Sequence, residues 1–380
     1  QGNAAIITLG NITFGSAPVN IKAWTYLPNG VQDPIPGDDT LDEDYFAALS
    51  GTYTVGGVNP NFPNVIAAAE ALTKYGTCGD VVFDIRPGTY TGKVTINKPL
   101  YVNNPNKVTF QAENGNASSV TITYSTTAYN DPVLTLNEAD YITLKKLTVE
   151  APSGNYGQCI ALKGDSDEDS IVGCRIINNC TVMTTYNAGI FAYPTYTNYS
   201  GDDLVIKDNT INGGYMSVCI YNQSYTDNLI IDNNDITSGG PYCSYVFYTY
   251  GLKFTNNILK GSNTYNTNYG VYAYYAQQGP EIVNNKISNL YYAGIYLYSP
   301  SGNSNNDRGK VINNSIITKS GTTSYYPFMY YYGSNMNILN NTVVNNGNSA
   351  SYYAAYILLS SYSNNTFYNN VFANLAGGPV

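Results

Sequence analysis

Carboxylates are the side chains of this sequence whose spacing best fits acid–base chemistry. A coil of about 25 residues would bring several aspartates to neighbouring levels of one face, namely Asp202, Asp203, Asp208, Asp232 and Asp235. Hydrolysis of a glycosidic bond needs such carboxylates, because one protonates the leaving group and another activates water or attacks the sugar. Asp203 and Asp208 are the catalytic candidates. The structural alternative is that Asp208 and Asp235 are turn residues beside an asparagine-rich segment.

The chain contains no histidine, and this limits the remaining chemistry. It excludes a Ser–His–Asp triad and a histidine general base, and it makes a zinc site improbable. A polysaccharide lyase would need an arginine or lysine base, and the three arginines are Arg86, Arg175 and Arg308. We find no acidic cluster on a neighbouring repeat that would accompany any of them. The sequence therefore favours binding over catalysis.

Two acidic segments carry oxygen ligands for a hard cation. In one of them Asp165, Asp167 and Asp169 alternate along the chain, which suits calcium. The other spans residues 38–44. The alternative is a solvated acidic turn, because neither has a twelve-residue loop with a central glycine and a distal glutamate. Calcium is the only cofactor that the sequence suggests.

Tyrosine gives the strongest surface signal, with 40 residues among 380. Six four-residue segments at the repeat spacing end in tyrosine, and strand alternation would turn the first and third residues inward and the fourth outward. The predicted outward file is Tyr193, Tyr221, Tyr248, Tyr274, Tyr298 and Tyr331, with Tyr272, Tyr296 and Tyr356 in a second file. At strand spacing six rings would cover about 24 Å. Such a surface either stabilises the fold by stacking or is a flat platform for glycan or a partner chain.

An internal repeat positions these residues. Apolar residues, an Asn-Asn pair, a variable residue and another apolar residue recur, as in residues 230–236, 282–287 and 311–316. The second asparagine is residue 209, 234, 257, 285, 314, 341 and 370, so the steps are 25, 23, 28, 29, 27 and 29 residues. This period and the β-branched residues around it indicate a solenoid with three short strands and three turns per coil. Asparagine tolerates left-handed turns and can hydrogen-bond from coil to coil. The predicted fold is all-β, a right-handed parallel β-helix.

Three regions are expected along the chain. Residues 1–50, with strands at 5–8 and 19–24 and then an acidic loop, form a small β-region or the end of a preceding domain. Residues 51–80 are a capping segment, whose amphipathic helix at 61–76 would cover the open end of the solenoid. The β-helix spans residues 81–380. No cap is recognisable at its last coil, so we expect a fragment of a longer chain, or an end covered by an adjacent module or another subunit.

Composition excludes several classes of protein. A net charge of -9 and a pI of about 4.5, without a basic cluster, argue against nucleic-acid binding. No apolar run is long enough to span a membrane. Six cysteines are present, and Cys159–Cys180 and Cys219–Cys243 are each about one coil apart. Disulfide pairing and buried free thiols are both compatible with that spacing.

One stretch of the chain carries a family resemblance. It comprises Ser-Gly-Thr-Tyr-Thr-Val-Gly-Gly at 50–57, Pro-Asn-Phe at 60–62 and residues 79–90, which include Arg-Pro-Gly-Thr-Tyr. It resembles the start of β-helix modules in large secreted surface proteins of gliding, polysaccharide-associated Gram-negative bacteria. The later repeats resemble the generic repeat of pectate-lyase-like proteins, so that residues 50–380 are covered.

The resemblance implies export to the cell surface, often by type IX secretion. Asp-Ser/Thr-apolar triplets, found here at Thr40 and Ser170, resemble the O-glycosylation signal of such bacteria. The Arg-Pro-Gly-Thr-Tyr segment also resembles pectin methylesterases, but their glutamine and paired-aspartate motifs are missing. Gly-Asp-Asp at 201–203 matches a fragment of the polygalacturonase signature, whose other parts are missing.

These observations favour a non-catalytic extracellular module. We expect an adhesin or structural surface protein that contacts polysaccharide or neighbouring subunits through its tyrosine face. The alternative is a polysaccharide lyase or glycoside hydrolase, because the same fold carries both kinds of function.

Overall fold

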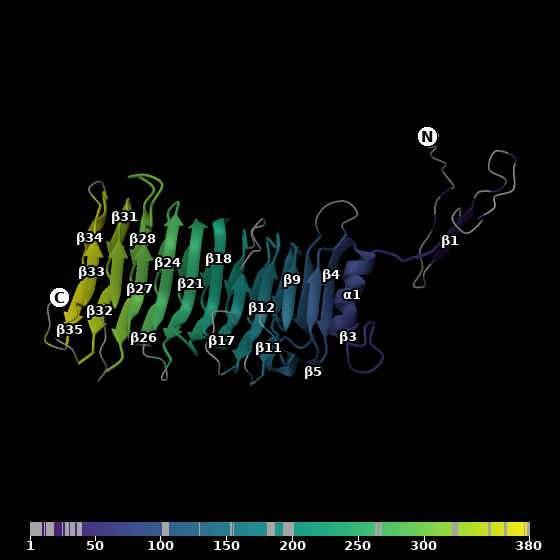
Figure 1. Ribbon diagram of the computed structural model, residues 1–380, viewed down its shortest axis with the longest axis horizontal. Coiled ribbons are helices and arrows are strands. Elements are labelled where there is room, and N and C mark those ends of the chain that lie inside the picture. Colours follow the sequence, from purple (N-terminus) through teal and green to yellow (C-terminus); the bar gives the residue numbers. More distant parts are fainter. Residues whose placement is uncertain are drawn as a thin grey trace.

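The computed structural model describes residues 10, 12, 19–24, 26, 30, 35, 40–100, 106–128, 130–152, 154, 156–180, 187–192, 201–262, 265, 268–320, 326–348, 351–360, 363–375 and 377. They form an all-β, right-handed parallel β-helix of about 11 turns. Figure 1 shows the coils stacked along the long axis from α1 to β35. The predicted fold class is confirmed.

Each complete coil contributes one strand to each of three parallel sheets, as the repeat predicts. Sheet 1 contains β3 (Leu49–Val55), β4 (Thr77–Ile85), β7 (Val108–Ala112), β10 (Ile142–Lys145), β13 (Ser170–Val172), β16 (Val205–Lys207), β19 (Ile230–Asp232), β22 (Lys253–Thr255), β25 (Glu281–Val283), β28 (Gly309–Ile312), β31 (Met336–Leu339) and β34 (Thr366–Tyr368). Sheet 2 contains β5 (Gly88–Thr91), β8 (Val120–Thr123), β11 (Thr148–Ala151), β14 (Arg175–Asn178), β17 (Thr210–Gly213), β20 (Asp235–Thr237), β23 (Ile258–Lys260), β26 (Lys286–Leu290), β29 (Ser315–Thr318), β32 (Thr342–Asn345) and β35 (Val371–Asn374). Sheet 3 contains β6 (Val94–Asn97), β9 (Leu134–Asn137), β12 (Gln158–Lys163), β15 (Ala188–Ala192), β18 (Met216–Asp227), β21 (Tyr242–Tyr250), β24 (Tyr269–Gln277), β27 (Ala293–Tyr298), β30 (Phe328–Tyr331) and β33 (Ala355–Leu358).

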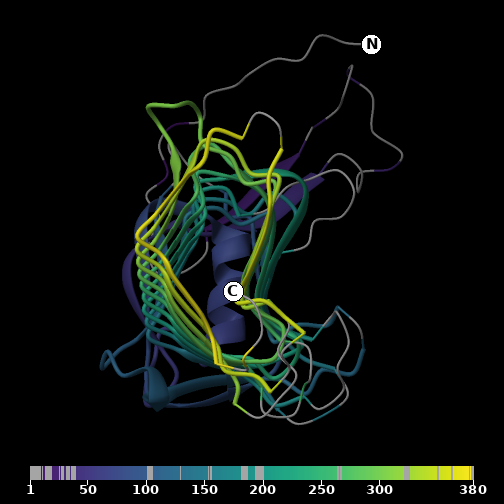
Figure 2. The same ribbon diagram turned by 90° about the vertical axis from the view of Figure 1, so that its left-hand side faces the viewer.

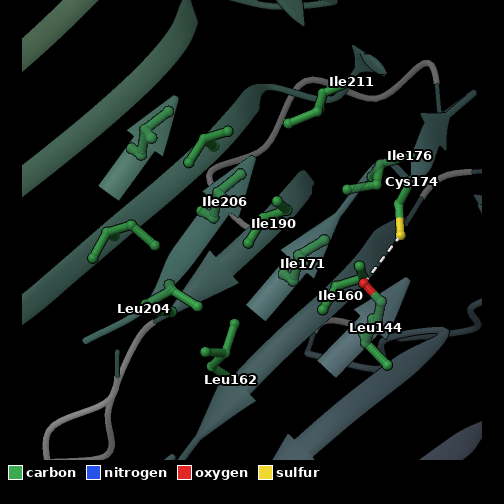
Figure 3. Close-up of a cluster of buried hydrophobic side chains, with 14 of the residues drawn as sticks. Leu144, Ile160, Leu162, Ile171, Cys174, Ile176, Ile190, Leu204, Ile206 and Ile211 are labelled. Atoms are coloured by element: carbon green, nitrogen blue, oxygen red, sulfur yellow. Dashed lines mark hydrogen bonds between the residues drawn. The ribbon is translucent and has the colours of Figure 1, made fainter. Parts of the chain in front are cut away.

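The core lies inside the coil, where apolar residues of successive coils stack in columns. Leu144, Ile171 and Ile206 are register partners in sheet 1 and are fully buried. Figure 3 shows this column facing inward residues of the other two sheets, among them Ile176 and Ile190. Because every coil adds to the same columns, the apolar burial that drives folding is distributed along the whole axis.

The two asparagines of each repeat have different functions. The first takes the left-handed turn between sheets 1 and 2, with φ of 53° at Asn233 and 59° at Asn284. The second is buried and joins coils: the Nδ2 of Asn285 donates to the Phe254 carbonyl and to Asn314 Oδ1, both at 2.9 Å. The buried column is Asn209, Asn234, Asn257, Asn285, Asn314, Asn341 and, at the last coil, the less buried Asn370.

The helix α1 spans Val65–Tyr75 and is shorter than the predicted 61–76. Phe62 lies outside it, because its backbone pairs with Thr54 and Gly56. Asn64 then caps the helix by accepting the Ala67 N–H at 2.9 Å. Figure 2 shows α1 across the opening of the solenoid, and its buried residues Val65, Ala68, Ala69, Ala71 and Leu72 join the core.

Two boundaries near the N-terminus differ from expectation. The first strand of sheet 1 is β3, which precedes α1 and pairs in parallel with β4, so the sheet begins before residue 81. The expected strand at 19–24 is β1 (Val19–Trp24), and it pairs with β2 (Thr40–Tyr45) in a two-stranded antiparallel sheet. Asp42, Glu43 and Asp44, expected in an acidic loop, therefore lie on a strand, where Lys22 and Asn20 bind Asp42 across the ladder. The strand expected at 5–8 lies outside the described residues.

Candidate functional site

The outer face of sheet 3 carries the predicted concentration of tyrosine. Its register places Tyr245, Tyr272 and Tyr296 in one outward row. The next row contains Tyr221, Phe247, Tyr274, Tyr298 and Tyr331. We call these two rows, together with Tyr242 and Tyr269 beside them and Tyr356 at the end of the first row, the aromatic array. The strands β18, β21, β24 and β27 that carry most of it are labelled in Figure 1.

The sequence prediction was wrong about Tyr248. Phe247 takes its place in the file, while Tyr248 has a left-handed backbone and stacks on Tyr275 in a separate row. The error comes from Ser244, which occupies the inward position that is apolar in the other coils. Ser244 is fully buried, and its hydroxyl donates to the Gly270 carbonyl at 3.0 Å. A pattern based on apolar residues therefore aligns this coil one residue too late. It assigns Tyr245, which points outward, to an inward position.

Ring orientation decides what the array offers to a ligand. Neighbouring rings of successive coils lie nearly parallel, with centroids 5.1 Å apart for Tyr245–Tyr272, 4.6 Å for Tyr272–Tyr296 and 4.5 Å for Tyr274–Tyr298. From β21 to β27 the ring faces are therefore covered by the ring of the next coil, whereas the planes of Tyr221 and Phe247 are at 70° and those of Tyr298 and Tyr331 at 34° to each other. The accessible parts are ring edges and hydroxyl groups, so the surface is ribbed and hydroxyl-bearing rather than the expected flat platform. Tyr193, also expected here, lies outside the described residues.

The phenols of the array stay protonated over a wide pH range. Burial, and after it the charges of neighbouring phenols, raise the pKa of Tyr242 and of Tyr331 to about 12. Burial also raises the pKa of Tyr245, Tyr269 and Tyr272. Tyr274 and Tyr296 place their hydroxyl oxygens 3.3 Å apart. At physiological pH the array is therefore a neutral surface of hydrogen-bond donors and acceptors.

The two catalytic candidates do not form a pair. Asp203 and Asp208 lie in the turns before and after β16, up to about 16 Å apart at strand spacing. The carboxylates of glycosidases are roughly 5 to 9.5 Å apart. Asp208 accepts a hydrogen bond from Asn233 Nδ2 at 2.7 Å and Asp203 accepts one from Asn228 Nδ2 at 2.9 Å. Both have left-handed backbones, so the structural reading of Asp208 as a turn residue fits its geometry.

A ladder of aspartates lies in the turn between sheets 3 and 1. Oδ1 of Asp140 accepts the backbone N–H of Asp167 at 3.2 Å, Asp167 accepts that of Asp202 at 3.0 Å, and Asp202 accepts that of Asp227 at 2.7 Å. Burial is the first cause that raises the pKa of Asp167 to about 7, and the charges of Asp202 and Asp165 add to it. This acidic ladder, Asp140–Asp167–Asp202–Asp227, was not recognised in the sequence, although the four residues recur near the repeat period.

Two of the three predicted calcium ligands, Asp167 and Asp169, accept backbone N–H groups with one carboxylate oxygen each. Asp167 accepts two backbone N–H groups, and Asp169, which is fully buried, accepts the Ile142 N–H at 2.8 Å. Asp165 is exposed. Among the described residues no three carboxylate, cysteine or histidine groups converge on a cation site. Calcium binding by Asp165, Asp167 and Asp169 stays a prediction.

The two glycosylation candidates differ in setting. Thr40 begins β2 and is half-buried. Ser170 begins β13, and the Asp169 that precedes it in the triplet has no exposed surface. An enzyme that reads Asp169 would therefore have to act before this coil folds. Modification of either residue stays a prediction.

All six cysteines are free thiols, so neither Cys159–Cys180 nor Cys219–Cys243 is a disulfide. Five of them are buried, and burial raises the pKa of Cys174 and Cys180 to about 11. Figure 3 shows the Cys174 thiol donating to the Leu144 carbonyl of the preceding coil, at 3.4 Å. The cysteines act as small core residues here.

Comparison with known proteins gives the fold family. Over the described residues no helix is long and apolar enough to cross a membrane. No curated protein sequence matches the chain. The structure is similar to the lacto-N-biosidase of family GH136 from Eubacterium ramulus, with 8% identity, 85% of this chain and 68% of that chain covered, and a TM-score of 0.50. It is also similar to Escherichia coli YbhC (11% identity, 91% and 90% covered, TM-score 0.44) and to the pectin methylesterase of Aspergillus niger (15%, 87% and 87%, TM-score 0.34).

These identities relate the chain to the solved structures by fold alone. The profile described as "Right handed beta helix region" matches residues 135–325, which is half of the chain. This match and the three parallel sheets agree. The chain belongs to the right-handed β-helix family.

Proposed function

We propose that this protein is a non-catalytic extracellular module that contacts polysaccharide through the aromatic array. The observation that carries the proposal is the continuity of the array across the coils from β18 to β33. Large aromatic surfaces usually mark contact sites. Tyrosine also binds at a small conformational cost, since stacking already fixes its rings.

The exposed chemistry of the array fits a hydroxyl-rich partner. Ring edges and neutral phenols give donors and acceptors in rows, repeated at each coil about 4.8 Å further along the axis. A polysaccharide chain presents hydroxyl and ether oxygens at a comparable repeat. Hydrogen bonds along the rows, rather than stacking of sugars on ring faces, would supply the affinity, because the ring faces are covered by each other.

The carboxylates favour a non-catalytic reading of the same fold. Asp232 binds Lys207 at 3.0 Å, and Asp235 binds Lys260 at 3.0 Å. Asp203 and Asp208 are too far apart to act on one bond. A glycoside hydrolase or lyase is the second candidate, supported by the exposed Asp203 at the edge of a surface hollow. Turnover of a polysaccharide that is lost in Asp203→Asn or Asp208→Asn would replace our proposal with this one.

The test removes hydroxyl groups and leaves the rings in place. We expect a variant with Tyr272→Phe, Tyr274→Phe and Tyr296→Phe to fold normally and to bind its polysaccharide about tenfold more weakly, a loss of about 1.4 kcal/mol. Affinity electrophoresis against acidic and neutral polysaccharides measures the binding, and a reducing-end assay on the same mixtures measures turnover. Tyr368→Phe is the matched control, since Tyr368 is 71% exposed on sheet 1. Equal binding by the triple variant and the wild type would rule out the array as the contact surface.

We also propose self-association or contact with an adjacent module through the last coil. Phe367 and Phe372 are register partners of the fully buried Ile338 and Val343 but are only half-buried, and Val371 beside them is 55% exposed. Light scattering over a concentration series should find dimers or larger species that Val371→Lys disperses. A monomer at every concentration would exclude self-association.

A further inference from the structure

A hollow of about 480 Å³ lies on the outer face of sheet 1, away from the aromatic array. It is lined by Lys107, Tyr141, Thr143, Glu168, Ser170 and Asp203. Lys107, Tyr141, Glu168 and Asp203 fall at equivalent positions of four successive coils, just before β7, β10, β13 and β16. At strand spacing the hollow therefore runs about 14 Å along the axis, with the lysine at one end and the carboxylates at the other.

Side-chain size explains why the sheet is hollowed here. Thr143 and Ser170 are register partners that point outward, and both are small. The row before them carries the long side chains of Tyr141 and Glu168, and the row beyond them carries the exposed Lys145 and Lys207. A row of small hydroxyl residues between two rows of larger ones leaves a trough with a polar floor.

The polar groups of the hollow have unused hydrogen-bonding capacity. Glu168 accepts the Tyr141 hydroxyl at 2.8 Å with Oε1, and Asp203 accepts Asn228 Nδ2 with Oδ1, so each carboxylate keeps one oxygen without a partner in the described part of the chain. Lys107 Nζ and the hydroxyls of Thr143 and Ser170 also have no hydrogen-bond partner in the described part of the chain. A hydroxyl-bearing ligand could bind all of these groups at once.

The backbone is also strained in the turns that precede β10, β13 and β16. Tyr141, Glu168 and Asp203 have φ of 62°, 56° and 53°. Later coils place Asn228, Gly251, Gly279, Asn335 and Asn364 at the equivalent left-handed turn, which are the residue types that adopt it at least cost. Tyrosine and glutamate are expensive there, and such outliers are a reason to look for a function of the side chain.

The side of the hollow formed by Tyr141, Glu168 and Asp203 is acidic. The hydrogen bond to Glu168 is the first cause that raises the pKa of Tyr141, and the charges of Glu168, Asp140 and Asp203 also contribute. The acidic ladder runs beside it, and Asp165 lies in the same turn. Lys107 is the cation of the lining, and the exposed Lys145 and Lys207 lie along the opposite wall, where Lys207 pairs with Asp232. The acidic side attracts a cationic group of a ligand, and the lysines attract its acceptor oxygens.

We propose that this hollow binds a saccharide that carries protonated amino groups, with an amine on Glu168 and Asp203, hydroxyls on Thr143 and Ser170, and an acceptor oxygen on Lys107. The site lies on a different sheet from the aromatic array and does not depend on the function proposed for it. Its length suits a short stretch of an amino-sugar chain. A uronic acid bound in the same pose would place a carboxylate against Glu168 and Asp203, so we expect it to bind more weakly.

Calorimetric titration of the full chain with a hexamer of β-1,4-linked glucosamine at pH 6 tests the proposal. We expect saturable binding that weakens with salt, at least tenfold weaker binding of the N-acetylated hexamer, and weaker binding of hexagalacturonate. Glu168→Gln should weaken glucosamine-hexamer binding at least tenfold while it keeps the hydrogen bond from Tyr141. Ser170→Phe should abolish binding by filling the trough from an exterior position.

Matched variants separate the site from general attraction to an acidic protein. Glu281→Gln removes a carboxylate from the same face, four coils beyond Ser170, and should leave the affinity unchanged. The variant with Tyr272→Phe, Tyr274→Phe and Tyr296→Phe should also bind the hexamer with wild-type affinity, whether or not its affinity for polysaccharide is reduced. The proposal would be overturned if neither Glu168→Gln nor Ser170→Phe changed the affinity for the hexamer. A requirement for added calcium, or no binding of the hexamer to the wild type, would also overturn it.

Discussion

At the residue scale, two adjacent asparagines do different physical work. The first supplies a left-handed backbone at the surface, a conformation that glycine also adopts. The second is buried, and its amide satisfies two backbone groups of the preceding coil. The sequence repeat identifies both asparagines, but only their hydrogen bonds in the structure show that the two contribute differently to stability.

Asn285→Ala should destabilise the protein by about 3 kcal/mol, because it leaves the buried Asn257 N–H and Phe254 carbonyl without partners. Asn284→Gly is the matched control and should change stability by less than about 0.5 kcal/mol, since glycine tolerates φ of 59°. Urea unfolding followed by circular dichroism measures both. Equal effects of the two substitutions would contradict this division of roles.

At the element scale, the acidic ladder makes the stability of the turn between sheets 3 and 1 depend on pH. A carboxyl whose pKa is raised in the folded state stabilises the fold in its protonated form. That contribution is complete below its ordinary pKa and is lost as the pH rises through the folded value. For Asp167 the window runs from about pH 4 to about 7, so stability should fall across it.

Asp167→Asn should therefore raise the melting temperature at pH 8 and leave it nearly unchanged at pH 4. The amide oxygen can still accept the Gly201 and Asp202 N–H groups, but it carries no charge. After allowance for partial solvent exposure we expect a gain of about 1 kcal/mol at pH 8. Calorimetric melting at the two pH values provides the measurement, with Asp235→Asn, an exposed aspartate of sheet 2, as control. A loss of stability at pH 8 would show that the negative charge itself holds the turn.

The aromatic array has a pH dependence of the same sign, in a more alkaline window. Tyr242 and Tyr331 have raised pKa values, which favour the fold while their phenols are protonated, and this contribution is full below pH 10 and lost toward pH 12. Phenolate absorbance during an alkaline titration should therefore rise late, together with unfolding. Early ionisation of most tyrosines at pH 10 with an intact fold would mean that the array is more open than its geometry indicates.

At the scale of the whole molecule, the period of the asparagine pairs was enough to predict three strands per coil and the parallel sheets, and the amphipathic pattern at 61–76 predicted the cap. It could not locate the start of sheet 1, because β3 is separated from β4 by a helix and lacks the repeat. It misplaced Tyr248 because a buried serine replaced an apolar residue. The acidic ladder and the hollow were missed because both depend on side chains of separate coils, whose alignment only the register supplies.

The central claim is that the aromatic array contacts polysaccharide. Hydroxyl-radical footprinting, read by mass spectrometry with and without a bound polysaccharide, tests it most directly. Our account predicts protection of Tyr245, Tyr272, Tyr274, Tyr296 and Tyr298, and no protection of Tyr368 on sheet 1. Protection confined to other faces, with the array tyrosines modified equally in both samples, would contradict it.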